Sequence, residues 1–356
     1  MKTKRSLRSM IAGILLTTVI AVHGTVCAFE NPVSLARQGS FAVGGRVISD
    51  GKGNAFHGDH GYVFYQVPTH ARKYPLIFVH GIYQFSKTWE STPDGRDGFQ
   101  NMFLAKGYAT YNLTMPRRGN AGRATESGKI DVVFDEALWF NRFRLGIWPD
   151  YFPDTQFPRE NPDALNQYFR QITPNTAAFD HEAAADTLAA LFERIGEGIL
   201  VPHSQGGKHT WMAIPRTDKI KGVVAWEPGG FYTFSDDEPD PKIDFEIAEQ
   251  FKTNEYIKVE PDVFEKFTKM PILIIYGDHI PGKPCGNPEQ DEWGVRLQLA
   301  RLWRDAVNRR GGDVTVIHLP ELGYHGNTHF PFSDKNNREM AKIMENWLHE
   351  KGLDAR

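Results

Sequence analysis

The sequence predicts an α/β fold with one mostly parallel central sheet flanked by helices. Short, continuous apolar runs recur along the chain, as in strands that are buried on both faces. Stretches with helical periodicity separate these runs, and such alternation is typical of a parallel sheet with helices on both sides. The 356 residues, 40% of them hydrophobic and 12% aromatic, are enough to build a large core.

The first 28 residues have the features of a secretory signal peptide. A basic segment precedes an apolar run over residues 10–22, and the small residue Ala28 precedes Phe29. The apolar run is too short to span a membrane comfortably. We therefore expect cleavage after about Ala28, a folded domain over 29–356 in the periplasm or outside the cell, and no membrane contact after cleavage.

Charge and cysteine content exclude several other classes. The leader contains four basic and no acidic residues, so its removal takes the formal charge from −3 to −7, which argues against a nucleic-acid partner. Cys27 would leave with the leader, so that Cys285 remains without an internal disulfide partner. His57, Asp59 and His60 are close in sequence, but no further ligand is nearby, and a solvated loop is expected there instead of a metal site.

The first elements are expected before residue 120. Alternating residues predict strands over 45–49 and 61–67, with a hairpin around Gly51-Lys52-Gly53. The apolar run 75–79 predicts a buried strand that ends at His80-Gly81. A helix over 98–106, a strand over 108–113 and a loop over 116–120 follow.

The second half continues the alternation. A helix is expected over 180–195, with Asp180 as its N-cap. The remaining predicted strands and helices are as follows: strands over 198–201, 222–226, 272–276 and 314–319, and helices over 204–213, 291–308 and 335–351.

The segment from about 125 to 175 interrupts this alternation and predicts a cap insertion. A fifty-residue connection rich in aromatic residues is unusual within one domain. Its rings either form a small core of the insertion or line a substrate pocket. The two roles are compatible with each other. These residues are Phe134, Trp139, Phe140, Phe143, Trp148, Tyr151, Phe152, Phe157, Tyr168 and Phe169.

Ser204 has the sequence context of a nucleophile elbow. It lies between the predicted strand 198–201 and the following helix, in Pro202-His203-Ser204-Gln205-Gly206. Small flanking residues let such a strand-to-helix turn close and expose the serine. Pro202 stands where the G-x-S-x-G pattern has glycine, but the last residue of a strand can tolerate the fixed φ and missing N–H of proline.

The His80-Gly81 pair supplies the second part of the predicted site. It follows an earlier strand, where this architecture places one of two backbone donors for an oxyanion. We expect these donors to be the N–H groups of Ile82 and Gln205.

Together these motifs resemble the α/β-hydrolase superfamily. More narrowly, the chain resembles an atypical group of secreted bacterial esterases from about Gly45 to the C-terminus, most of the insertion excepted. The resemblance implies an α/β-hydrolase fold, a serine esterase activity, and a glutamate after strand six as the triad acid. The segments that carry it are HGIYQFSKTWESTPDGRDGF, LAKGYATYNL, HSQGG, AWEPGG, YGDHI and GYHGNTHFPFSDKNN.

Two acids and two histidines compete for the remaining roles. Glu227 and Asp278 each follow a predicted strand at the carboxyl edge of the sheet, and position alone does not distinguish them. The resemblance favours Glu227 through Glu227-Pro228-Gly229, with Asp278 as the alternative. In the late loop it favours His329 through the segment GNTHF, with His325 as the alternative base; His203, His209 and His279 are expected to pack or bond nearby.

The sequence therefore predicts a secreted serine hydrolase that cleaves a small carboxylic ester, with Ser204, His329 and Glu227 as its triad and no cofactor or metal. The insertion favours an apolar or aromatic substrate, and Arg117, Arg118 and Arg123 either contact an anionic group or are solvated. No pattern indicates an oligomeric state. Alternatives are hydrolysis of a lactone, an amide or a C–C bond, acyl transfer, and a non-catalytic binding protein on the same scaffold.

Overall fold

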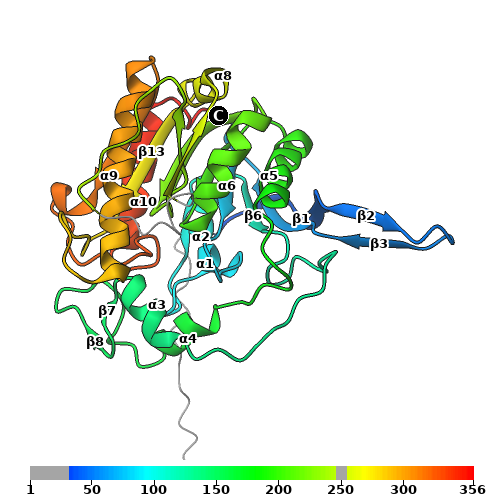
Figure 1. Cartoon of the computed structure of the whole chain (residues 1–356). Helices are drawn as coiled ribbons and strands as arrows, with labels where there is room; N and C mark the ends of the chain where they lie inside the picture. Colours follow the sequence, from blue (N-terminus) through cyan, green and yellow to red (C-terminus); the bar gives the residue numbers. More distant parts are fainter. Residues whose placement is uncertain (1–31, 246–254) are drawn as a thin grey trace, which may run out of the picture. The chain divides into compact units, whose positions relative to one another are not determined.

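An eight-stranded sheet lies at the centre of the structure, a computed structural model that describes residues 32–245 and 255–356 (Figure 1). The expected signal peptide lies outside these described residues. β4 pairs antiparallel with β1 and with β6, and all other neighbours pair parallel. In spatial order the strands are β1 (Leu35–Val43), β4 (Gly61–Pro68), β6 (Thr110–Thr114), β5 (Leu76–Val79), β9 (Gly198–Pro202), β10 (Ile220–Trp226), β13 (Pro271–Tyr276) and β14 (Asp313–His318).

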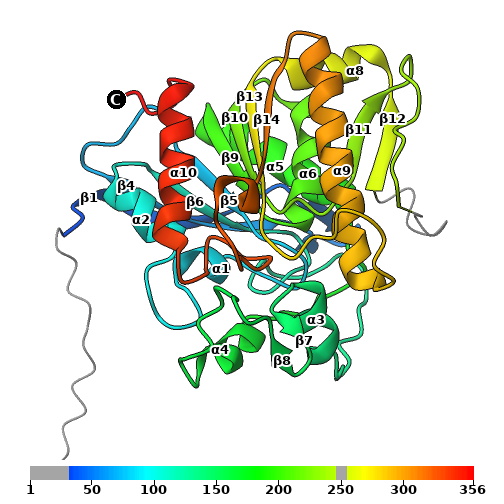
Figure 2. The same ribbon diagram turned by 90° about the vertical axis from the view of Figure 1, so that its left-hand side faces the viewer.

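Helices cover both faces of this sheet (Figure 2). In β10, Val223 and Ala225 pack toward one set of helices, while Val224 and Trp226 pack toward the other. Both faces are thus buried, which explains the continuous apolar runs in the sequence. One face carries α5 (His181–Ile195), α6 (Gln205–Ala213) and α9 (Pro288–Arg309), and the other carries α1 (Lys87–Glu90), α2 (Phe99–Ala105) and α10 (Asn337–Glu350).

The predicted elements of the parallel sheet are confirmed to within a few residues. Asp180 caps α5, because its carboxylate accepts a hydrogen bond of 3.0 Å from the Ala183 N–H. The hairpin around residues 51–53 is also confirmed, and it projects away from the sheet in Figure 1. It joins β2 (Arg46–Ser49) to β3 (Ala55–Gly58), whereas β4 pairs with β1, a strand that the sequence analysis did not predict.

Shorter elements complete the described chain. β11 and β12 form a separate parallel pair, α8 and η3 connect β12 to β13, η1 lies between α6 and β10, and η4 follows β14. Their bounds are β11 (Tyr232–Ser235), β12 (Tyr256–Val259), α8 (Pro261–Glu265), η1 (Ile214–Arg216), η3 (Lys266–Thr268) and η4 (Leu319–Leu322). No helix in the described ranges combines the length and apolar character needed to cross a bilayer.

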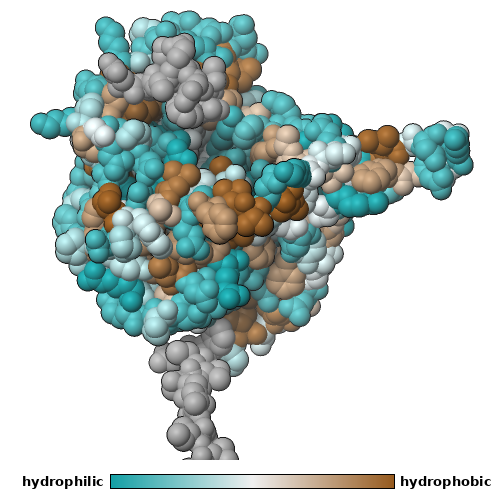
Figure 3. All heavy atoms as spheres, turned by 60° about the horizontal axis from the view of Figure 1, so that its bottom comes forward, coloured by the Kyte–Doolittle hydropathy of each residue, from teal (hydrophilic) through white to brown (hydrophobic). Residues whose placement is uncertain are grey.

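The insertion forms α3 (Glu136–Arg142), β7 (Gly146–Ile147), β8 (Asp150–Tyr151) and α4 (Ala164–Arg170), at the bottom of Figure 1. Phe140, Phe157 and Tyr168 are buried in a core shared with the sheet, while Trp139 and Phe143 also line a pocket. The expected separate core of the insertion is therefore wrong, because its buried rings join the core of the sheet, and two rings also line a pocket. Phe134 neither packs in the core nor lines the pocket, because it is 97% exposed. Figure 3 brings this side forward and shows apolar side chains gathered among polar ones.

Candidate active site

Ser204 occupies the sharp turn between β9 and α6. Its φ of 51° lies in the left-handed region, which is costly for a residue with a side chain. The turn is tight: a Cβ on Gly206 would lie 2.9 Å from the His80 carbonyl oxygen. Pro202 is the last residue of β9 and pairs with Val79, so the strand accommodates it at its end. Ser204 is 5% exposed and reaches solvent through the pocket that it lines.

The two expected oxyanion donors lie on either side of Ser204 and line the same pocket. A Cβ on Gly81 would come within 2.8 Å of the Ser204 Cβ, so the loop before Ile82 presses directly on the elbow. Gln205 is the first residue of α6, where backbone N–H groups have no partner inside the helix. Within the described part of the chain, neither the Ile82 nor the Gln205 N–H meets an acceptor.

Glu227 follows β10 and is fully buried. Its segment is bonded to the elbow on both sides, because the Ser204 N–H donates to the Trp226 carbonyl (3.1 Å) and the Gly229 N–H donates to the Ser204 carbonyl (2.9 Å). Like Ser204, Glu227 has a positive φ, here 50°. The turn after the strand thereby directs the carboxylate toward the late histidine loop.

His329 meets this carboxylate in the interior. Its Nδ1 lies 3.1 Å from Glu227 Oε2, and both side chains are fully buried. Because a carboxylate only accepts, this bond places the proton on Nδ1 and leaves Nε2 as the basic nitrogen. Burial lowers the pKa of His329 well below its ordinary range, and Arg144, Arg296 and Arg142 act in the same direction.

His203 connects the histidine loop to the elbow. Its Nε2 donates to the His329 carbonyl oxygen at 2.9 Å, and the two ring centroids lie 4.6 Å apart. Phe143 stacks on the His329 ring at 4.9 Å, and Trp293 lies 4.3 Å from it. Both of these rings line the pocket of Ser204, whereas His329 does not. Among the described residues, its buried Nε2 has no hydrogen-bond partner.

The alternative pair, Asp278 and His325, lies in a different setting. The Asp278 carboxylate accepts hydrogen bonds from the backbone N–H groups of His279 (2.6 Å) and Gly326 (2.8 Å). His325 Nδ1 is 3.4 Å from Asp278 Oδ2, but its side chain is 62% exposed. Asp278 therefore anchors the late loop through backbone amides.

Asp334 fixes the same loop from the other side. This buried carboxylate accepts bonds from the Thr328 N–H (2.8 Å), the Thr328 hydroxyl (2.9 Å) and the Asn327 amide (3.1 Å). Burial raises the pKa of Asp334 to about 7, against the opposing effect of these donors. Hydrogen bonds to the Asp334 carboxylate thus fix Asn327 and Thr328, the residues just before His329.

Arg144 is a site residue that no motif in the sequence indicates. Its guanidinium comes from the insertion, is fully buried, and donates to Glu227 Oε1 at 2.6 Å. It also donates to the Asp278 carbonyl oxygen at 2.8 Å, and Glu227 Oε1 accepts a further bond from the Gly277 N–H. A lone arginine in an aromatic segment gives no sequence signal for such a contact. Its positive φ of 56° becomes visible only in the structure.

The pocket around Ser204 has a volume of about 290 Å³ and is lined by two kinds of side chain. Trp139, Phe143 and Trp293 are aromatic. Next to these rings, a chain of ion pairs links Arg142 to Glu292 (2.8 Å), Glu292 to Arg296 (2.7 Å), and Arg296 to Glu255 (3.1 Å). The remaining lining residues are Ile82, His181, Ser204, Gln205, Lys208 and Gly229.

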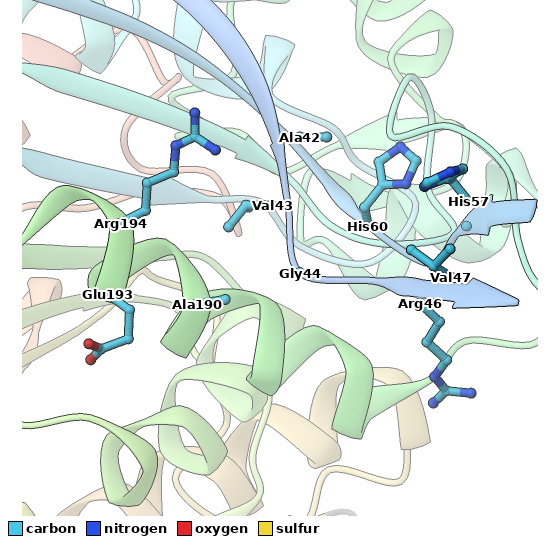
Figure 4. A pocket seen from close by; sticks show the side chains of 11 residues that line it. Ala42, Val43, Gly44, Arg46, Val47, His57, His60, Ala190, Glu193 and Arg194 are labelled. Carbon is cyan, nitrogen blue, oxygen red and sulfur yellow. The ribbon is translucent and has the colours of Figure 1, made fainter. Parts of the chain in front are cut away.

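A larger hollow, of about 610 Å³, lies between the start of the β2–β3 hairpin and α5 (Figure 4). Its charged side chains do not converge: Arg46 and Arg194 lie at opposite ends and point apart. Arg46 pairs with Asp180 at 2.9 Å, and Arg194 lies over the Phe41 ring at 4.0 Å. Size alone therefore does not make this hollow a second site.

Two groups of polar residues bear on metal binding. The expected solvated loop at His57, Asp59 and His60 is wrong for Asp59, which is fully buried and forms a pair with Arg117 (2.7 Å) that gives its carboxylate a structural role. Elsewhere in the described ranges, ligand atoms of Asp154, Asp278 and His279 lie within 4.8 Å of one another. The His279 ring stacks on Phe152 at 3.9 Å, and this packing accounts for its position.

The expectation that Arg117, Arg118 and Arg123 contact a ligand or solvent is wrong for the first two. Arg117 and Arg118 are buried, and their guanidinium groups bond to protein atoms. Arg123 lies over the Phe56 ring at 4.1 Å. None of the three lines the pocket of Ser204.

Comparisons with known proteins agree with this architecture. No family model matches the chain. The structure of a bacterial esterase superimposes with a TM-score of 0.72 and 29% sequence identity, and the match covers 90% of this chain and 98% of that one. The chain is also 27% identical over 323 residues to "Probable secreted lipase phiG" of Fungal sp. (strain ATCC 74256), covering 81% of this chain and 85% of the fungal protein. Together with the architecture described above, these similarities show that the chain has the α/β-hydrolase fold and is an enzyme of the carboxylic ester hydrolase class.

Proposed function

We propose that this protein hydrolyses a compact carboxylic ester through an acyl-enzyme, with Ser204 as nucleophile, His329 as general base and Glu227 as triad acid. The observation that carries the proposal is the buried 3.1 Å contact between His329 Nδ1 and Glu227, next to a serine elbow whose backbone is bonded to the glutamate segment. A serine hydroxyl needs such a base and orienting acid because it is a weak nucleophile on its own.

The reaction runs in two halves. Ser204 Oγ attacks the ester carbonyl while His329 Nε2 takes its proton, and the N–H groups of Ile82 and Gln205 stabilise the oxyanion. The imidazolium returns the proton to the departing alcohol, which leaves an acyl group on Ser204. Water then attacks the acyl carbon while His329 Nε2 takes one of its protons. The imidazolium returns this proton to Ser204 Oγ as the acyl–oxygen bond breaks, which releases the acid and restores the free serine. No cofactor takes part in these steps.

The pocket supports a small substrate with ring character. Its volume of about 290 Å³ lies at the lower end of the range of about 300–1,000 Å³ for small-molecule pockets. The aromatic lining residues suit a flat or apolar group, while the ion-paired residues disfavour a long hydrocarbon chain, which cannot replace the hydration of charged groups. We propose short acyl or aromatic esters as the substrate class.

We also propose that the enzyme acts outside the cytoplasm. The basic and apolar leader of the sequence supports export. The fungal protein to which the chain is similar is named a secreted lipase, which agrees with this proposal.

The test is a panel of chromogenic esters from acetyl to palmitoyl, with benzoyl esters, matched amides and lactones, assayed on the chain from residue 29. We expect acetyl, butyryl or benzoyl esters to be cleaved with the highest kcat/KM and the Ser204→Ala variant to be inactive. Faster cleavage of amides or lactones than of esters would contradict the proposed reaction. A preference for palmitoyl esters would contradict the proposed substrate size.

A further inference from the structure

We propose that Arg118 is a positioning residue for the oxyanion hole: its guanidinium fixes the peptide group that carries the Ile82 N–H and the side chain of Gln205. This inference rests on the proposed function, because it assumes that these two amides bind the oxyanion. Arg118 does not touch the pocket, so any effect on the reaction passes through the residues that it holds.

The contacts of Arg118 reach both sides of the elbow. Nη1 donates to the carbonyl oxygens of Gly81 (3.2 Å) and Gln84 (3.3 Å), and Nη2 donates to Gln205 Oε1 (3.1 Å). Nε donates to Asn175 Oδ1 at 2.7 Å, which fixes the guanidinium plane from the far side. The side chain is fully buried. One rigid fork therefore connects the loop after β5 to the first residue of α6.

The Gly81 contact matters because of peptide geometry. The Gly81 carbonyl and the Ile82 N–H belong to one planar peptide group, so fixing the oxygen also fixes the direction of the N–H. His80 Nδ1 donates to the same carbonyl at 2.8 Å; its Nε2 accepts from the Met115 N–H at 3.0 Å, which assigns the proton to Nδ1. With the Gln84 N–H, which donates at 3.3 Å, three donors act on this carbonyl. They polarise the peptide group and make its N–H a stronger donor.

The charge of Arg118 is also unusual. In the described part of the chain its hydrogen-bond acceptors are neutral amide oxygens, and no carboxylate lies within ion-pair distance. Its guanidinium lies over the rings of Phe179 (5.1 Å) and Tyr83 (5.8 Å). Burial lowers the pKa of Arg118 to about 10, which still leaves it charged at neutral pH. A buried cation without a counter-ion costs stability, but it favours negative charge that develops on the nearby oxyanion.

The neighbouring Arg117 provides a matched control. It is equally buried, but it forms a two-bond pair with Asp59 (2.7 and 2.9 Å) and does not contact Gly81 or Gln205. A substitution there removes a buried arginine without touching the oxyanion hole.

The experiment compares Arg118→Met, Arg118→Lys and Arg117→Lys for kcat, KM, thermal unfolding and affinity for phenylboronic acid, whose tetrahedral serine adduct needs the oxyanion hole. We expect Arg118→Met to lower kcat by about 10²-fold, the lower end of the effect of losing an oxyanion donor. KM should stay within threefold, and boronate affinity should fall with kcat. Arg118→Lys should lose less, and Arg117→Lys should lower only the unfolding temperature.

Unchanged kcat and boronate affinity in Arg118→Met would overturn the inference, as would an equal kcat loss in Arg117→Lys. If Arg118→Met does not fold, Gln205→Met tests the same link, because it keeps the backbone N–H and removes the Oε1 partner; kcat should fall at constant KM, and an unchanged kcat would contradict the role of that contact. Activity retained in Ser204→Ala would instead refute the proposed function, so the two failures are distinguishable.

Discussion

Arg144 and Glu227 form a fully buried ion pair of 2.6 Å that joins the insertion to the residue proposed as the triad acid. The other oxygen of Glu227 faces His329, so the carboxylate is shared between a permanent cation and the imidazole. The pair therefore balances the charge of the acid before His329 is protonated. The insertion is thus part of the site's electrostatics as well as a wall of the pocket.

The charge of Arg144 should set the pH dependence of the reaction. Because a nearby cation disfavours imidazolium, removing it raises the pKa of His329. In Arg144→Met the acid limb of kcat/KM should therefore move to higher pH, by about one to three units. The measurement is kcat/KM from pH 4 to 9, normalised to active sites by phosphonate titration.

Arg144→Lys is the matched control, because it keeps the charge and loses the forked geometry. Its acid limb should stay near that of the wild type even if its stability falls. An acid limb in Arg144→Met that coincides with the wild type would refute this electrostatic role.

Replacement of Glu227 and of Asp278 by the matching amides should lower kcat to different extents. Glu227→Gln removes the charge that stabilises the imidazolium and should lower kcat by about 10³–10⁴-fold, as in other triads that lose their acid. Asp278→Asn weakens two acceptor contacts to backbone amides and should mainly lower stability, with kcat within about tenfold. Steady-state kinetics and thermal unfolding of both variants test this ranking, and the reverse order would reassign the acid.

Alanine substitutions of the two late-loop histidines should also lower kcat to different extents. His329→Ala removes the proposed base and should lower kcat by at least about 10⁴-fold. His325→Ala changes an exposed side chain and should leave kcat within about twofold. Single-turnover assays at equal active-site concentration compare them. A larger loss in His325→Ala would place the base at the surface and contradict the proposed site.

Asp334 should give stability a specific pH dependence. Its carboxyl ionises near an ordinary value of 3.8 when unfolded but only near 7 when folded. Between these pH values the folded state binds more protons, so this group's contribution to the free energy of unfolding falls as pH rises. The free energy of unfolding of wild type minus that of Asp334→Asn should therefore decrease from pH 4 to 7 in urea denaturation. A constant or rising difference would show that Asp334 is ionised in the folded protein throughout this range.

Much of the fold could be predicted because doubly buried strands leave continuous apolar runs. β9 and β10 read clearly from sequence for this reason, and their ends located Ser204 and Glu227 at one edge of the sheet. β1 was missed because it is an edge strand with mostly exposed or half-buried residues. Its pattern of apolar residues is correspondingly weak.

The long-range contacts of the site could not be predicted. Arg144 lies 83 residues from Glu227, and Arg118 lies 87 residues from Gln205. Neither residue stands in a motif, and their sequence context suggested solvent exposure or a ligand for Arg118. Their roles follow from how the insertion and the loop after β6 pack against the sheet edge, which local periodicity does not encode.

The most direct test of the central claim is to label the chain from residue 29 with a fluorophosphonate and to locate the adduct by peptide mass spectrometry. We expect stoichiometric modification on Ser204, none in Ser204→Ala, and labelling slowed at least about 10³-fold in His329→Ala, because the serine then lacks its base. Equal labelling rates in wild type and His329→Ala, or an adduct on another residue, would contradict the proposed triad.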